Sequence, residues 1–186
     1  RAARLCEPPL NGAGVVMGVH YTIYCKKSLA QVSPNDLLKG VTATNLAARA
    51  QKEGVAEEQI ALALDVLRIE NLKPPGFVLY RLFHRPGAMR QVEVECWESK
   101  DDVQAVIDEE LEELAAEGHP HFKQIRAHLK QCVDVVDSSS AAPSEPMARV
   151  LAREVACWLA GRFDGIIRTA DEKWWRLGPK GDLQPL

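Results

Sequence analysis

The spacing of apolar residues switches between two periods along this chain, and the switch limits the folds that it can adopt. Across 91–97 apolar and polar residues alternate, which is typical of a strand with one buried face. Across 101–116 apolar residues recur every three or four positions, as on the buried stripe of a helix. This stripe consists of Val103, Ile107, Leu111 and Leu114, with Val106 beside it. Such neighbouring segments predict helices that pack on a sheet.

The same two periods, together with turn and cap signals, divide the rest of the chain. Ser33 and Asp36 form a capping-box pattern around Pro34, and Gly54 is a natural helix end. Strands are predicted at 20–27, 77–84, 91–97 and 132–137, and a hairpin at 165–169 and 173–177. Helices are predicted from Pro34 onward and at 44–53, 57–69, 101–116, 122–130 and 147–163. This order predicts an α+β fold: a ferredoxin-like split βαβ antiparallel sheet with helices on one face, extended by a C-terminal helix and a β-hairpin.

The length and the first residues of the chain predict its domain organisation. A chain of 186 residues suits one domain. Residues 1–16 lack an apolar period and contain two prolines and two glycines, whereas Met17 directly precedes a strand pattern. We therefore expect 1–16 to be a disordered N-terminal extension, Met17 to be the natural start, and 17–186 to form a single α+β domain.

The five cysteines are widely spaced, odd in number and without a Cys-x-x-Cys pair. This pattern favours free thiols over disulfides or a structural zinc site, and free thiols are typical of a reducing compartment. No stretch approaches the roughly 20 apolar residues that span a bilayer. We expect a cytoplasmic protein with no membrane partner.

Motifs of known catalytic chemistry are not found in the sequence. There is no nucleophile elbow, no phosphate-binding glycine loop and no zinc-protease motif. The serines 138–140 follow a predicted strand and could supply a nucleophile, but a solvated serine loop at 138–146 is the more common structure. We assign no catalytic residue, no metal ligand and no cofactor.

Two alternative functions have some support in the sequence. If 121–132 is helical, His121, His128 and Cys132 fall near one helix face with His119 close by, and imidazole and thiolate are good zinc ligands. A small metal-dependent hydrolase is therefore one alternative. The other is a helix-turn-helix regulator at 45–68. Its second helix begins with Glu57 and Glu58, and acidic residues oppose the phosphate contacts that DNA binding needs.

The distribution of charge is the most informative functional feature. The formal net charge is only −3, which does not indicate a nucleic-acid partner. The 25 residues 93–117, however, hold 11 acids and one base, Lys100, so their net charge is −10. The remaining 22 bases and 15 acids give +7. The near-neutral total therefore conceals a polarised molecule.

Helical and strand geometry places most of these acids away from the expected core. The predicted binding acids of the helix 101–116 lie on the side opposite its apolar stripe. In the preceding strand, Trp97 lies on the same face as Glu93 and Glu95. We predict that these residues bind a basic protein partner, and that Trp97 is an anchor. The predicted binding residues are Glu93, Glu95, Trp97, Asp101, Asp102, Asp108, Glu109, Glu112 and Glu113. An ordinary solvated helix face is the alternative explanation of the same pattern.

The C-terminal part of the chain resembles that of a known class of proteins. The segment 152–160, reading Ala-Arg-Glu-Val-Ala-Cys-Trp-Leu-Ala, is followed by Asp-Gly-Ile-Ile at 164–167 and by adjacent tryptophans at 174–175. This helix-then-hairpin ending is similar to that of small cytoplasmic immunity proteins of bacterial polymorphic or contact-dependent toxin systems. The resemblance implies a compact α+β protein without catalytic motifs that inhibits a basic toxin by binding it.

Overall fold

A computed structural model describes residues 19–30, 32–86, 91–140, 142 and 144–186. The expected N-terminal extension 1–16 and the expected start at Met17 lie outside the described residues. No helix in the described part of the chain is both long and apolar enough to cross a membrane.

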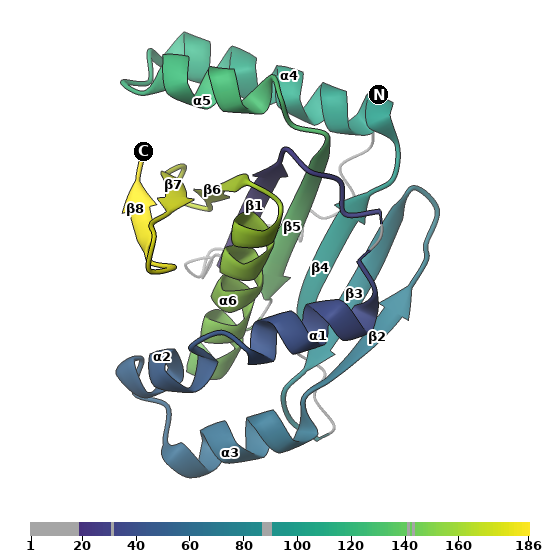
Figure 1. The fold of residues 1–186 in the computed structure, drawn as a ribbon, viewed down its shortest axis with the longest axis vertical. Helices are drawn as coiled ribbons and strands as arrows, with labels where there is room; N and C mark the ends of the chain where they lie inside the picture. The colour runs from purple at the N-terminus through teal and green to yellow at the C-terminus, as the bar shows by residue number, and fades with distance from the viewer. Residues whose placement is uncertain (1–18, 31, 87–90, 141, 143) are drawn as a thin grey trace, which may run out of the picture.

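Eight strands form one antiparallel sheet (Figure 1). In chain order they are β1 (Val19–Cys25), β2 (Arg68–Leu72), β3 (Phe77–Phe83), β4 (Val92–Trp97), β5 (Asp134–Ser140), β6 (Gly165–Thr169), β7 (Trp174–Leu177) and β8 (Leu183–Pro185). Their order in the sheet is β2-β3-β4-β5-β1-β6-β7-β8. With the six helices described below, this sheet confirms the α+β class.

The ferredoxin-like topology is not confirmed. A split βαβ unit built from β1, β3, β4 and β5 would place β1 beside β4. In the structure β5 lies between them and pairs with both, so that Val136 is opposite Ile23 on one side and Cys96 on the other. The C-terminal strands β6, β7 and β8 do extend the sheet, and β6 joins it through β1.

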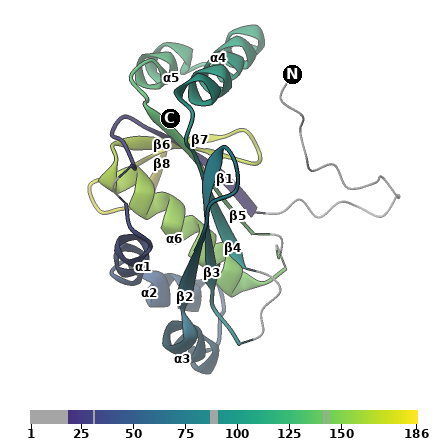
Figure 2. The ribbon, with the colours of Figure 1, turned by 90° about the vertical axis from the view of Figure 1, so that its right-hand side faces the viewer.

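Four helices cover one face of the sheet: α1 (Pro34–Thr42), α2 (Leu46–Lys52), α3 (Glu57–Val66) and α6 (Pro146–Arg162). The predicted capping box is present, because Ser33 Oγ accepts a hydrogen bond from the Asp36 amide and the Asp36 side chain accepts one from the Ser33 amide. Figure 2 shows the sheet nearly edge-on, with α1, α2 and α6 on the same side.

The remaining helices, α4 (Lys100–Glu117) and α5 (Phe122–Leu129), pack against side chains of the opposite face. Figure 2 shows both helices at one end of the sheet. The expectation that helices cover one face only is therefore corrected. The reason is the pleat, which points neighbouring strand residues to opposite faces. Ile23 and Val136 face α6, whereas Tyr24 and Val135 face away from it and need the cover that α4 and α5 provide.

Several element boundaries differ from the sequence expectation. The third helix ends at Val66, and β2 begins at Arg68, inside the range 57–69 that was expected to be helical. On α3 the buried residues are Ile60 and Ala63, whereas the apolar residue Leu64 is 39% exposed. Strand β8 forms beyond the predicted hairpin, where no element was predicted, and β5 runs through Ser140 into the expected loop.

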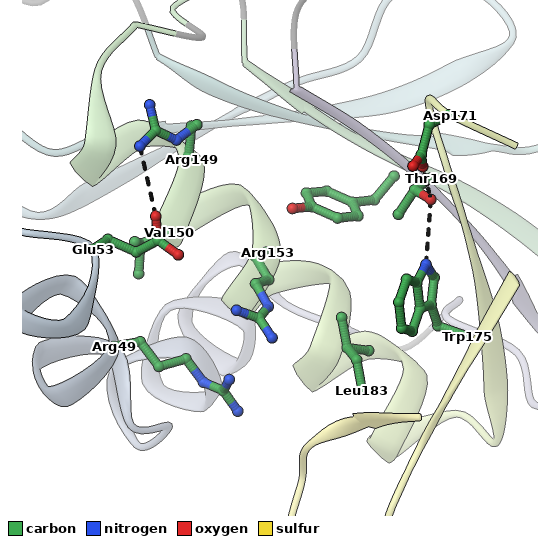
Figure 3. Close-up of a pocket in the computed structure, with 10 residues that line it drawn as sticks. Arg49, Glu53, Arg149, Val150, Arg153, Thr169, Asp171, Trp175 and Leu183 are labelled. Atoms are coloured by element: carbon green, nitrogen blue, oxygen red, sulfur yellow. Dashed lines mark hydrogen bonds and ion pairs between the residues drawn. The ribbon is translucent and has the colours of Figure 1, made fainter. Parts of the chain in front are cut away.

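A pocket opens on the α6 side, where α2 and α6 approach β1 and the C-terminal strands (Figure 3). Arginines from both helices line it. Nothing in the sequence pattern indicated this pocket, because its two helices lie about 100 residues apart in the chain.

Candidate functional site

Helix α4 presents the acidic segment, and its ends are defined by local capping. Ser99 Oγ accepts a hydrogen bond from the Asp102 amide at 3.3 Å, and Gly118 ends the helix in the left-handed conformation with φ of 66°. Val103, Ile107 and Leu114 pack with the sheet residues Tyr24 and Val135. In Figure 1, α4 and α5 lie side by side at one end of the molecule, so the outer side of α4 is not covered by another described element.

The acids of α4 that were predicted to bind a partner are all exposed: Asp101, Asp102, Asp108, Glu109, Glu112 and Glu113. We call this set the acidic face of α4. Asp101, Asp108 and Glu112 are spaced by seven and four residues, so they form a stripe opposite the buried residues. Within the described part of the chain, no ion pair forms at Asp101, Asp102 or Glu112.

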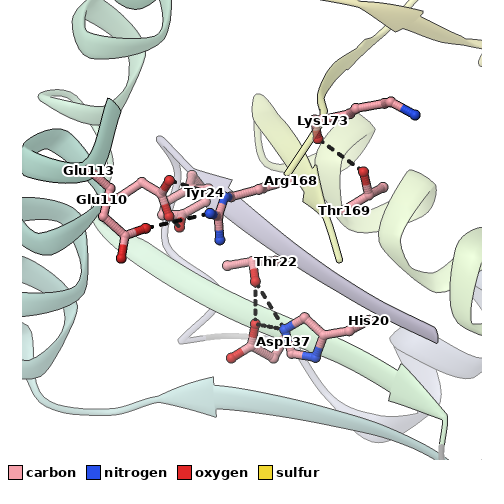
Figure 4. Close-up of polar contacts among 9 residues, drawn as sticks. All are labelled: His20, Thr22, Tyr24, Glu110, Glu113, Asp137, Arg168, Thr169 and Lys173. Atoms are coloured by element: carbon pink, nitrogen blue, oxygen red, sulfur yellow. Dashed lines mark hydrogen bonds and ion pairs between the residues drawn. The ribbon is translucent and has the colours of Figure 1, made fainter. Parts of the chain in front are cut away.

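Glu110 belongs to the same acidic segment but points the other way. Its side chain is buried, accepts a hydrogen bond from the Tyr24 hydroxyl at 2.8 Å and forms an ion pair of 3.1 Å with Arg168 (Figure 4). Arg168 also lies 3.5 Å from Glu113. Burial raises the pKa of Glu110, while the Tyr24 hydrogen bond and Arg168 oppose that rise. Burial beside Glu110 raises the pKa of Tyr24 as well. This network connects α4 to β1 and β6.

The strand acids Glu93 and Glu95 lie on the sheet face that α6 does not cover. Glu93 is paired with Arg81 at 2.9 Å. Glu95 is half-buried and lies opposite Asp137 of β5 in the sheet register. Burial raises the pKa of Glu95, and the neighbouring Asp137 and Glu93 raise it further. Carboxylates from two strands are therefore held close together beside α4.

Asp137 was not among the predicted binding residues, because strand alternation across 132–137 gives its face of the strand but not its neighbour Glu95 on β4. It accepts a hydrogen bond from Thr22 Oγ1 at 2.8 Å, and its Oδ1 lies 3.1 Å from His20 Nε2 (Figure 4). The hydrogen bond to Asp137 raises the pKa of His20 above 6.5. The positive charges of Arg168 and of protonated His20 therefore partly offset the negative charge of the carboxylates on this face.

Trp97 shares the strand face of Glu93 and Glu95, as alternation predicts, but it is only partly exposed. It packs against the smaller core beneath α4, and its ring centroid lies 6.4 Å from that of Phe77. Its indole Nε1 is buried and has no hydrogen-bond partner among the described residues. Of the adjacent C-terminal tryptophans, Trp174 is buried and Trp175 is half-exposed.

The structure does not bring the candidate zinc ligands into one cluster. His128 Nε2 lies 3.1 Å from the Tyr24 carbonyl oxygen, and the Cys132 thiol donates to the His128 carbonyl. His119 and His121 lie at the other end of α5, with their ring centroids 6.1 Å apart. Among the described residues, no three His, Cys, Asp or Glu side chains are grouped so as to hold a metal ion.

The three serines are part of β5, and the expectation of a solvated serine loop is wrong for them. Ser138 is buried and donates a hydrogen bond to the Ala152 carbonyl on α6, and Ser140 is buried and accepts one from the Ala142 amide. Ser139 lies on the opposite face, in register with His20 and Glu93. All three candidate nucleophiles therefore belong to a strand, and two of them, Ser138 and Ser140, are buried in structural hydrogen bonds.

The candidate helix-turn-helix consists of α2 and α3, joined by a turn in which Gly54 has a φ of 79°. Glu57, Glu58 and Asp65 are exposed on α3. This surface is acidic and would repel a phosphate backbone.

Comparison of the chain with protein-family models, with curated proteins and with solved structures finds no significant match.

Proposed function

We propose that this protein is a non-enzymatic binding module that docks a basic protein partner on the acidic face of α4. The observation that carries the proposal is the exposure of all six acids on one helix, without ion pairs at Asp101, Asp102 and Glu112 within the described chain. Glu93, Glu95 and Trp97 extend the contact onto the adjoining sheet face. Complementary charge would accelerate association and select the partner.

Asp101 and Asp102 lie in the first turn of α4, where acids favour the helix. The acids further along α4 oppose helix stability, and this supports a role beyond solubility. Asp108 and Glu112 repel each other across one turn, as do Glu109 and Glu113. The C-terminal end of a helix carries partial negative charge, yet the last turn of α4 contains no base. A surface needed only for solubility could mix both signs of charge at no such cost.

The finer proposal is an immunity-type inhibitor that acts in the bacterial cytoplasm on a basic toxin. The toxin would be inhibited because the bound protein covers its active site. If the toxin is a nuclease, the carboxylates of α4 would occupy the positions that nucleic-acid phosphates use, since both present negative oxygens to the same cations.

The experiment is capture of a partner by the immobilised protein, followed by kinetics with the purified partner. The test variant combines Asp101→Lys, Asp108→Lys and Glu112→Lys, a stripe that does not include the Arg168 contacts. We expect a basic partner, an association rate at least tenfold lower for the variant at low salt, and a weaker salt dependence. Coexpression with a toxic partner should restore growth with the wild type and not with the variant.

The matched control combines Glu57→Lys, Glu58→Lys and Asp65→Lys, which changes the net charge equally at exposed positions of α3, away from α4. It should associate almost as fast as the wild type. If the association rate falls equally in both triple variants, the effect comes from net charge alone, and a docking site on α4 is excluded. A captured partner that is acidic would exclude the proposal as well.

A further inference from the structure

The arginine-lined pocket on the α6 side is independent of the acidic face of α4. Its cavity volume is about 390 Å³, which lies in the range of small-molecule sites. Arg49 comes from α2, and Arg149 and Arg153 come from α6. Figure 3 shows these arginines on one side of the pocket and Trp175 on the other.

Arg49 is held in place by a buried carboxylate and a backbone carbonyl. Its Nε lies 2.6 Å from Glu154 Oε1, and the Glu154 side chain is only 2% exposed. A second nitrogen of the same guanidinium donates to the Gly181 carbonyl at 3.0 Å. The guanidinium is thus fixed by a buried ion pair and by the loop before β8, and its position is set before any ligand arrives.

Arg149 and Arg153 are four residues apart on α6, so they project from the same helix face and repel each other. Arg149 lies 3.6 Å from Glu53, which is 44% exposed at the rim. Arg153 interacts with the Cys157 side chain, and no carboxylate of the described chain pairs with it. An anion in the pocket would relieve the repulsion and supply the counter-charge at Arg153.

The opposite wall is suited to an apolar or aromatic group. Tyr21, Trp175 and Leu183 line it. The Trp175 indole is oriented by a hydrogen bond of 3.3 Å to Thr169 Oγ1. Asp171 is the acid on this side, and Lys173 at 2.6 Å compensates its charge.

We propose that this pocket binds a small phosphate monoester. The phosphate would lie against Arg153 and Arg149 with Arg49 at the base, and the organic group would lie against Tyr21 and Trp175. Phosphate is favoured over carboxylate because it carries a second charge and a third acceptor oxygen, which match guanidinium groups that arrive from two helices.

The test is calorimetric titration of the full chain with phenyl phosphate. We expect saturable binding to the wild type and a loss of at least about tenfold in affinity for Arg153→Gln, since one charge-assisted contact is removed. Arg162→Gln, an exposed position on the same helix outside the pocket, should bind as the wild type does. Absence of saturable binding to the wild type, or equal affinity of the Arg153→Gln protein, overturns the proposal.

Further titrations separate the parts of the site. Benzoate should bind more weakly than phenyl phosphate, and inorganic phosphate should bind more weakly because it cannot use the Trp175 wall. If benzoate binds as tightly as phenyl phosphate, the proposed preference for phosphate over carboxylate is wrong. If inorganic phosphate binds as tightly as phenyl phosphate, the proposed contact of an organic group with Trp175 is wrong. Arg153→Lys keeps the charge but not the planar fork, so an intermediate affinity is expected from a protein with an unchanged circular dichroism spectrum.

Discussion

The helices on the two sides of the sheet differ in how much of their surface they bury. Helix α6 buries 11 of its 17 residues, whereas α4 buries four of 18, one of which is Glu110. The core on the α6 side also includes side chains from α1, α2 and α3. The comparison indicates that α6 contributes most to fold stability, whereas α4 is attached by a narrow stripe and leaves the rest of its surface to charge.

The largest expected effects compare the two cores directly. Leu151 on α6 is fully buried, and Leu151→Ala should lower the free energy of unfolding by about 4 kcal/mol, because the surrounding core cannot close the cavity. Ile107→Ala on α4 should lower it by about 2 kcal/mol, because the smaller core can relax toward solvent. Urea unfolding measures both values. An equal loss in the free energy of unfolding for Ile107→Ala and Leu151→Ala would contradict the proposed difference between the two cores.

A somewhat smaller effect is expected at the ion pair that attaches α4. Arg168→Met should destabilise the protein by roughly 2 kcal/mol, less than for a fully buried pair because Arg168 is 25% exposed. The loss comes mainly from leaving Glu110 buried without its cation. Glu110→Gln in the same chain should therefore recover much of the stability. A double variant that is no more stable than Arg168→Met would show that the buried charge is not the cause.

The pH dependence of unfolding tests the same carboxylate with a smaller effect. The pKa of Glu110 is raised above 4.5 in the folded protein, so the folded state holds this proton more tightly than the unfolded chain does. Its contribution to stability is complete below pH 4.5 and is lost as the pH rises through the raised pKa. The urea midpoint of Glu110→Gln should therefore fall less than that of the wild type from pH 4.5 to neutrality. Parallel curves would exclude Glu110 as the titrating group.

The smallest effect is expected at His20, which is 45% exposed. Asp137→Asn should lower the pKa of His20 toward 6.5, because it removes the charge that the protonated ring contacts. In the wild type this contact stabilises the fold below pH 6.5 and is lost as the pH rises through the raised pKa of His20. An NMR titration of the ring protons gives the pKa in both proteins. An unchanged value would assign the shift to another group, with Glu95→Gln as the next variant to examine.

Local elements were predictable where local chemistry determines them. The capping box at Ser33, the α4 helix and the hairpin of β6 and β7 all follow from neighbouring residues. Strand β2 was missed because its residues, Arg-Ile-Glu-Asn-Leu, show no clear alternation and are almost all exposed. Its formation depends on backbone pairing with β3, which a local pattern does not reveal.

The order of the strands and the contacts of the candidate site depend on residues far apart in the chain. The pair of apolar residues Val135 and Val136 already implies that both faces of β5 are covered, so the two-sided arrangement was open to prediction. The exposed acids of α4 were placed by helical period alone. The burial of Glu110 could not be predicted from the helical period, because its partner cation, Arg168, lies on β6. The arginine pocket was missed for the same reason.

The central place of β1 has a consequence for how the chain folds during synthesis. Both neighbours of β1, β5 and β6, are made more than 100 residues later. At about 5–20 residues per second, β1 waits on the order of 5–20 s on the ribosome with its pairing edges open. Residues 19–25 are therefore the segment most in need of a chaperone until β5 emerges, and a chain cut short before β5 should aggregate rather than fold.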